Sequence, residues 1–408
     1  MSESPQRAPD RDPDPGRRTA AATGYRWLST GSLLIAFTGS APSGLYPLYQ
    51  ETWAISEQML TVAFSAFIMG ILVALTTLVP LSDRVERRAV LAAAVLCTVV
   101  AVVGFMLSEG LHWILPAGFL TGLGVGAYQG TVNAALVDMV PAELSGRATL
   151  ASTRMGSVGL AAGPLTAGQL GQFAPAPLRL LFVLELAALV PLAVAILRTP
   201  GTSERVAGMV TAPPSDRIRP RRAWVPLAFA VAFVSFAAGA VINALGSSIF
   251  VKTLGVDNLA VGGVVVALLF ASSALAQPLV LRLALAHALR IGLFVSAVGV
   301  TGTALAVAEG SPAGLLAATA VTGAGQGCAY AGSLALLNAR AEDRERGTIT
   351  GRYYTFAYCG AFMPVLATGA AISELGIAEA VLLFACCLGA VSLGIATAAG
   401  PVLRGSRR

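Results

Sequence analysis

The stretch TGLGVG at residues 121–126 recurs about half a chain length later as TGAGQG at residues 322–327. Each copy lies inside a long apolar segment, and glycine is more frequent in membrane-spanning helices than in soluble ones. Polar turns follow both copies, at residues 143–146 and 344–347. An internal repeat at this distance predicts two halves of similar construction, placed one after the other in a chain of 408 residues.

Twelve apolar stretches contain and surround these copies, and a helix needs about 20 such residues to cross a bilayer. The chain is 56% hydrophobic and only 12% charged, whereas soluble domains are about 25% charged. The stretches are uniformly apolar, which excludes the alternating strands of a membrane β-barrel. They run over residues 27–49, 59–81, 89–107, 112–137, 149–171, 178–197, 224–250, 259–281, 290–307, 313–337, 348–371 and 379–400. The sequence therefore predicts an all-α membrane protein with 12 transmembrane helices in two six-helix bundles related by a pseudo-two-fold axis.

The distribution of basic residues gives the orientation. Short cytoplasmic loops are enriched in lysine and arginine. Of the 27 basic residues, only Arg179 and Lys252 lie at the side away from the termini, and only Arg154 and Arg352 lie more than two residues inside a span. We therefore expect a multi-pass protein of the cell (inner) membrane with both termini cytoplasmic. The net charge of +6 reports this topology, and we expect no nucleic-acid partner.

The polar segments predict the domain boundaries. Residues 1–25 are rich in proline and charge and should form a disordered cytoplasmic tail. Two six-helix bundles at 26–197 and 224–402 flank a cytoplasmic linker at 198–223, and a short tail follows at 403–408. All five cysteines lie within spans, and both histidines, His112 and His287, lie in or next to loops. No group of residues has the spacing of a metal site or a catalytic triad, so we expect no catalytic residue, no metal, no cofactor and no enzyme activity.

The loop between the second and third spans carries Asp83 and three arginines in a short turn at the membrane face. Asp83 and Arg87 are four residues apart, so they can pair on one helical turn. Asp138, at the cytoplasmic end of the fourth span, is a further acid at the same depth. A solvated loop that merely follows the charge rule is the alternative interpretation of Asp83, Arg84, Arg87 and Arg88.

This loop resembles the signature motif of the major facilitator superfamily, G-x-L-a-D-r-x-G-r-k-x-x-l. Asp83, Arg84, Arg87, Arg88 and Leu91 match it, and Val79 and Glu86 stand where the motif has glycine. The resemblance extends over residues 26–402, because span number, linker and repeat agree. It implies a cytoplasmic gate that locks the halves together when the transporter faces outward. It further implies that Asp83 is the central acid, Arg87 its partner and Asp138 the acid of the neighbouring helix.

The fifth span contains glycine and proline at Gly159, Gly163, Pro164 and Gly168. Small residues at every fourth position allow helices to approach closely, so this helix-packing motif is explained by packing alone. It also resembles the antiporter motif of the same superfamily, G-x-x-x-G-P-x-x-G-G, with Ala167 replacing one glycine. This resemblance to the bacterial drug–proton antiporter group implies export.

One position departs from that group. Gly118 stands where the resemblance calls for an arginine linked to proton transfer, and Thr121 replaces the usual glutamine. We hypothesise that Arg154, in the cytoplasmic third of the fifth span, supplies the charge from a neighbouring helix. Glu185, in the outer third of the sixth span, is the other proton-coupling candidate, because a carboxyl group shielded from water takes up a proton more readily. A structural acid bonded to a neighbouring helix is the alternative for Glu185.

Neutral polar residues within the spans are candidates for lining a substrate cavity, although each alone is also explained as a helix–helix hydrogen bond. They are Thr38, Tyr46, Gln129, Asn133, Asn243, Gln277, Gln326, Tyr354 and Tyr358. Intramembrane charge is otherwise sparse, which favours loose recognition of apolar or amphipathic compounds.

The sequence thus favours a secondary active transporter that exports small apolar or amphipathic compounds in exchange for protons by alternating access. Its expected partners are the lipid bilayer, a small-molecule substrate and protons, and we expect a monomer. Two alternatives remain. One is a proton-coupled uptake symporter for a small metabolite, and the other is a non-transporting receptor or scaffold on the same fold, which the missing arginine at Gly118 supports.

Overall fold

A computed structural model describes the backbone at residues 15–81, 85–139, 145–198, 224–341 and 346–405, and the side chains at 23–81, 85–136, 151–198, 224–341 and 348–399. The first half comprises α1 (Pro15–Ser40), η1 (Ala41–Leu45), α2 (Tyr46–Trp53), α3 (Glu57–Val73), η2 (Ala74–Leu78), α4 (Val79–Leu81), α5 (Arg87–Met106), α6 (Leu111–Met139), α7 (Ser145–Phe173) and α8 (Leu180–Arg198). The second comprises α10 (Trp224–Ser248), η4 (Ile249–Thr253), α11 (Leu259–Ala276), η5 (Gln277–Arg282), α12 (Leu285–Ala308), α13 (Pro312–Arg340), α14 (Arg346–Leu375) and α15 (Ile377–Gly405).

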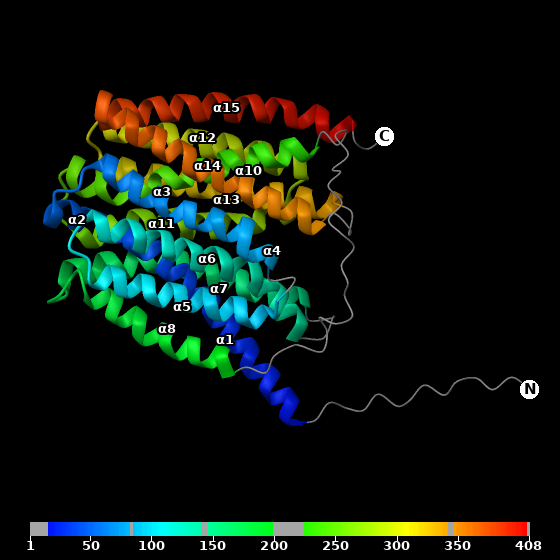
Figure 1. The fold of residues 1–408 in the computed structure, drawn as a ribbon. Coiled ribbons are helices and arrows are strands. Elements are labelled where there is room, and N and C mark those ends of the chain that lie inside the picture. Colours follow the sequence, from blue (N-terminus) through cyan, green and yellow to red (C-terminus); the bar gives the residue numbers. More distant parts are fainter. Residues whose placement is uncertain (1–14, 82–84, 140–144, 199–223, 342–345, 406–408) are drawn as a thin grey trace, which may run out of the picture.

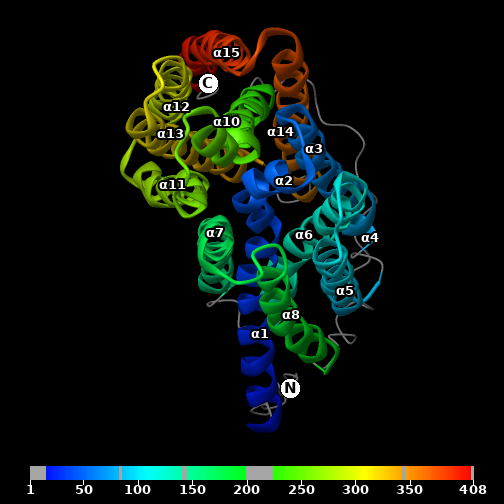
Figure 2. The ribbon, with the colours of Figure 1, turned by 90° about the vertical axis from the view of Figure 1, so that its left-hand side faces the viewer.

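The fold class predicted from the sequence is confirmed. Every regular element in the described residues is helical, and helices α1–α8 pack mainly on one another, as do α10–α15 (Figure 1; Figure 2). Eight helical segments among the described residues are long and apolar enough to cross a membrane by themselves. Helices α1, α6, α7 and α13 do not reach that criterion, and these carry the repeated glycines or many small and polar residues.

The first helix begins earlier than the sequence suggests. Helix α1 starts at Pro15, so the prediction of disorder is wrong for residues 15–25, whereas residues 1–14 lie outside the described part. Proline is well suited to the first helical turn, and the alanines that follow it favour helix strongly. The same helix ends at Ser40, where a 3-10 turn that contains Pro42 leads into α2.

The repeated glycines allow the same close helix packing in both halves. A methyl group on Gly122 or on Gly126 would collide with the backbone of Phe67 or Ile71 in α3, and one on Gly124 would collide with α5. In the second half, Gly323 and Gly327 meet the backbone of α11, and Gly325 meets α12. The central helix of each half is therefore pressed against two neighbours at contacts that only glycine permits.

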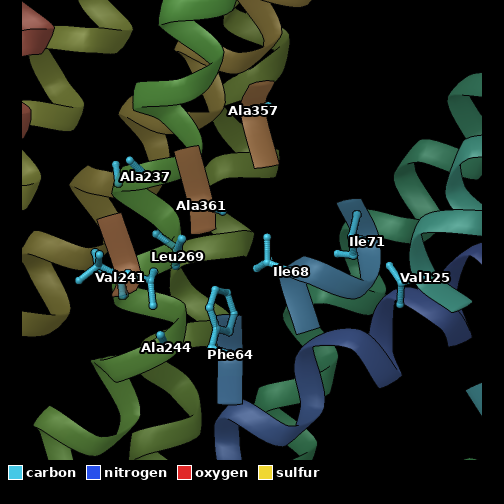
Figure 3. Close-up of a cluster of buried hydrophobic side chains, with 14 of the residues drawn as sticks. Phe64, Ile68, Ile71, Val125, Ala237, Val241, Ala244, Leu269, Ala357 and Ala361 are labelled. Atoms are coloured by element: carbon cyan, nitrogen blue, oxygen red, sulfur yellow. The ribbon is translucent and has the colours of Figure 1, made fainter. Parts of the chain in front are cut away.

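The molecule has two ends, which differ in how the halves meet. Helix α1 begins and α15 finishes at one end, here the terminal end, and α2 and η4 lie at the opposite one, here the closed end (Figure 1). Helices α3 and α7 of the first half contact α14 and α11 of the second, and α2 contacts α10. Figure 3 shows Phe64 and Ile68 of α3 directed toward labelled alanines of α10 and α14, so apolar side chains fill this junction.

Candidate functional site

Side chains of the two halves bind each other at the closed end. Gln50 of α2 accepts a hydrogen bond from Ser248 of α10 and donates one to Glu57 of its own half (3.1 Å). Beside it, the Lys252 Nζ atom lies 3.1 Å from the Glu51 carboxylate. We call Gln50, Glu51, Ser248 and Lys252 the closed-end latch. Because the ion pair is partly exposed, it contributes little alone, and the more buried amide–hydroxyl contact carries more of the interaction.

The helix-packing motif of α7 lies on both an internal and an inter-half contact. Gly159 and Gly163 face the backbone of α1 in their own half. Gly168 faces the other half: a methyl group there would lie 3.0 Å from Cα of Gly263 and 2.7 Å from the carbonyl oxygen of Leu259. The Pro164 carbonyl also meets Gly263. At the end of the same helix, the Gln172 side chain accepts a 2.7 Å hydrogen bond from the Leu259 amide.

A small cavity lies below the closed end, between α1, α3, α6 and α10. Its volume of about 20 Å³ is enough for one water molecule. Aromatic rings form part of the wall, and the polar lining residues are Ser43, Tyr46, Thr121 and Asn243. Asn243 is 8% exposed, and its carbonyl oxygen has no hydrogen-bond partner among the described residues. Gly118 also lines this space, so the position of the missing arginine faces a cavity.

Glu185 lies in α8 near the closed end and is 5% exposed. Neither carboxyl oxygen has a hydrogen-bond partner among the described residues. Tyr49 of α2 is close enough to interact with it electrostatically, and the Tyr49 hydroxyl is likewise buried and unpartnered in the described chain. The Tyr49 ring stacks on Trp53 with centroids 5.0 Å apart. The structural alternative for Glu185, a bonded acid, therefore finds no support in the described contacts.

The second half presents a group of aromatic rings. Phe236 of α10 lies edge-on to Tyr330 of α13 and to Tyr358 of α14, with centroids 5.7 and 5.1 Å apart. The hydroxyls of Tyr330 and Tyr354 are 3.3 Å apart. Tyr354 and Tyr358 are among the cavity candidates predicted from the sequence, whereas Phe236 and Tyr330 are not. Tyr330 follows Gln326 by four residues on one helix face, and this spacing was the available signal.

The remaining cavity candidates are dispersed. Gln326 packs its amide onto Gly239 of α10, one turn from Asn243, so these two predicted residues share one region. Gln129 of α6 lies close to Gly156 of α7, because a methyl group on that glycine would be 3.6 Å from the Gln129 amide nitrogen. Asn133 has a buried, unpartnered carbonyl oxygen in the described chain. Thr38 is buried in α1, and Gln277 begins the 3-10 turn η5 at the terminal end, away from the cavity.

The predicted cytoplasmic gate is only partly described. Asp83 and Arg84 lie outside the described residues, as does the side chain of Asp138. Arg87 and Arg88 begin α5 and are half-buried. Arg88 donates to the Leu197 carbonyl near the end of α8 in the same half, where a cation is favoured by the helix dipole. The pairing of Asp83 with Arg87 stays a prediction.

Arg154 lies at a different depth from position 118. Gly156 lies level with Gln129, and Gly118 is eleven residues further along α6. At about 1.5 Å per residue, Gly118 and Arg154 differ in depth by about 20 Å. Arg154 is exposed in the half of α7 nearer the terminal end, so the two positions are far apart in this conformation, and a role of Arg154 in proton coupling stays a prediction. Arg352, one turn inside α14, is also exposed.

No group of metal-ligating side chains occurs within the part of the chain that the structure describes. The chain matches the family model described as Major Facilitator Superfamily at residues 28–286 and again at residues 227–405. No curated protein matches its sequence significantly.

Solved structures with a similar fold include the nucleoside transporter NupG, with a TM-score of 0.71, 12% identity, and coverage of 92% of this chain and 98% of that one. A bacterial homolog of the human lysosomal transporter Spinster, inward-facing and unoccupied, has a TM-score of 0.70, 15% identity, and coverage of 97% and 98%. At these identities, the likeness concerns the fold alone.

Proposed function

The chain belongs to the major facilitator superfamily, and from that premise we propose that it exports small apolar or amphipathic compounds in exchange for protons. Transport by such a fold requires that a central site be exposed alternately to the two sides of the membrane. We assign the terminal end to the cytoplasm, because the sequence has nearly all basic residues in segments on the side of the two termini. The closed end then faces outward.

The chemistry of the interior supports the proposed substrate class, and one observation carries it. The polar side chains around the central helices are neutral amides and hydroxyls among aromatic rings, and Glu185 is the one acid buried within a described span. A highly polar or multiply charged substrate needs fixed polar partners to replace its hydration. An apolar or amphipathic molecule instead gains from contact with rings such as Phe67 and Phe236.

Glu185 is the proposed site of proton coupling. A carboxylate buried without a partner costs several kcal/mol, on the order of the penalty for any desolvated ion. Proton binding neutralises the carboxylate and removes that penalty. Whether Glu185 carries a proton therefore depends on how much water reaches its carboxyl group. A conformational change that opens the closed end changes that access and thereby links proton movement to transport.

The test measures accumulation of fluorescent lipophilic compounds in efflux-deficient bacteria, with and without a protonophore. Cells express the wild type, Glu185→Gln, or Glu109→Gln as the matched control, since Glu109 is an exposed acid in a loop at the closed end. We expect lower accumulation with the wild type and the control, lost in Glu185→Gln and lost with the protonophore. Equal accumulation in all strains at equal expression would refute export of such compounds.

Uptake of a polar metabolite by symport is the second candidate. It is favoured by three side-chain amides whose carbonyl oxygens are buried and unpartnered in the described chain, namely those of Asn133, Asn243 and Gln326. These acceptors suit a substrate that carries N–H or O–H donors. Proton-dependent accumulation of labelled hydroxylated or amino compounds in cells, instead of their loss, would favour this candidate.

A further inference from the structure

We propose that Glu185 and Tyr49 together form the proton-binding element of this transporter, and that α2 transmits its protonation state to the closed-end latch. The inference rests on the proposed function, which names Glu185 alone. It adds a second residue, a direction of coupling and the segment that carries it.

The first step is the isolation of the two groups. Glu185 and Tyr49 are buried at 5% and 0% exposure, and the carboxyl oxygens and the hydroxyl have no hydrogen-bond partner in the described chain. The Glu185 carboxyl group is close enough to act electrostatically on the Tyr49 hydroxyl. A phenol hydroxyl can donate a hydrogen bond to a carboxylate. Tyr49 is therefore the group best placed to donate one when Glu185 is ionised.

The second step is the position of Tyr49 in the chain. It occupies the middle of α2, a helix of eight residues, and the next two residues, Gln50 and Glu51, hold Ser248 and Lys252 of the other half. Tyr49, Gln50 and Glu51 are consecutive residues of this one short helix. Any displacement of Tyr49 toward or away from Glu185 therefore displaces the first half's side of the closed-end latch.

The third step concerns the other titratable groups near Glu185, which come from the helices packed against α8. Helix α8 packs on α1, α5 and α7. Cys97, near the middle of α5, points to α6, where its thiol donates to the Leu120 carbonyl. Arg179, just before α8, is exposed. The other titratable residues of these four helices with described side chains lie toward the terminal end: Tyr25, Arg26, Arg87, Arg88, Arg154 and Arg198. Tyr49 and, beside it, Tyr46 are thus the near titratable groups.

The direction of coupling follows. With the latch made, Glu185 has no water and no partner among the described residues, so this conformation favours the neutral acid. The ionised form needs water or a donated hydrogen bond, and it obtains water when α2 leaves α10 and the closed end opens. The proton enters from the outer solution, forms an O–H bond on Glu185 and favours the closed latch. It leaves toward the cavity lined by Tyr46, whose ring centroid is 6.3 Å from that of Tyr49.

The experiment measures the distance across the closed end over a pH series. Spin labels are attached at Thr52 of α2 and Asp257 of the other half, both exposed, in full-length protein in nanodiscs with its five native cysteines replaced. We expect the wild type to gain a long-distance population as the pH rises. In Glu185→Gln, the short-distance population should persist at every pH.

Three further variants make the test specific. Tyr49→Phe removes the hydroxyl but keeps the ring, so opening should require more alkaline buffer. Ser248→Ala weakens the latch, so the long-distance population should be larger at every pH while its pH dependence remains. Glu109→Gln, an exposed acid at the same end, should match the wild type.

The outcomes separate this inference from the proposed function. If Glu185→Gln keeps the wild-type pH response, or Tyr49→Phe matches the wild type, the inference is overturned, even where proteoliposomes still show proton-driven export. If wild-type proteoliposomes show no proton-driven export, the proposed function fails. A pH response of the labels that depends on Glu185 and Tyr49 then still supports the proton-binding element.

Discussion

Replacing Gly168 by alanine should open the closed end. In the described conformation, the added methyl group would lie 2.7 Å from the Leu259 carbonyl oxygen and 3.0 Å from Cα of Gly263. Favourable contact between carbon atoms needs about 3.5–4.0 Å, so α7 and α11 must separate by about 0.5–1 Å. Both neighbours are backbone atoms, which cannot turn aside as a flexible side chain can.

The size of the effect follows from the cost of overpacking, which is about 1–3 kcal/mol for an inserted methyl group that meets rigid surroundings. This cost falls only on conformations in which Gly168 and Gly263 touch. A difference of about 1–3 kcal/mol between two conformations changes their ratio about 5- to 150-fold. We therefore expect Gly168→Ala to increase the ratio of outward-open to closed-end protein by a factor within that range.

The assay is the same distance measurement between labels at Thr52 and Asp257, at one pH. The control is Gly394→Ala, the same exchange in α15, where a methyl group meets no atom within 4 Å. Both variants add one methyl group to a spanning helix, so loss of helix flexibility is matched. If Gly168→Ala and Gly394→Ala give the same distance distribution, the contact does not limit opening, and the reasoning is refuted.

Three other predictions concern packing, charge and substrate contact. Gly323→Val should reduce the yield and lower the melting temperature of purified protein far more than Gly389→Val. A methyl group on Gly323 would meet the Leu269 carbonyl, whereas one on Gly389 would meet no atom within 4 Å. Equal melting curves would contradict the packing role of the repeated glycine. Arg154→Ala should export at close to the wild-type rate, because Arg154 is exposed and about 20 Å in depth from Gly118; loss of proton-driven export at normal expression would restore it as a coupling residue. Phe236→Leu should raise the concentration for half-maximal transport of ring-containing compounds by about 2- to 10-fold, because an aromatic pair contributes about 0.5–1.5 kcal/mol. The value for aliphatic compounds should stay unchanged. An equal change for both classes of compound would show that the ring acts only in folding.

The sequence indicates several residues of the candidate site, but it does not indicate how their side chains are arranged in space. Glu185 stands out in the sequence because an acid inside a spanning segment is rare and expensive. Its neighbour Tyr49 does not, because a tyrosine near a span end is ordinary. The two residues are far apart in the chain, and only the packing of the first half brings them together. The difference in depth between Arg154 and Gly118 could not be predicted for a similar reason, since a sequence indicates a helix but not its depth relative to its neighbours.

The number and approximate limits of the spans, the repeat and the expected orientation can all be derived from the sequence. These depend on quantities that are local along the chain: the length of an apolar segment against the thickness of a bilayer, and the balance of arginine between loops. Two features emerge only from the assembled helices: Gly159 and Gly163 pack within one half while Gly168 packs across both, and α2 holds the latch. In lipid, all faces of a helix are apolar, so hydropathy cannot tell which face meets which helix. That choice is made by small residues, crossing geometry and a few hydrogen bonds, which exist only once the helices are packed together.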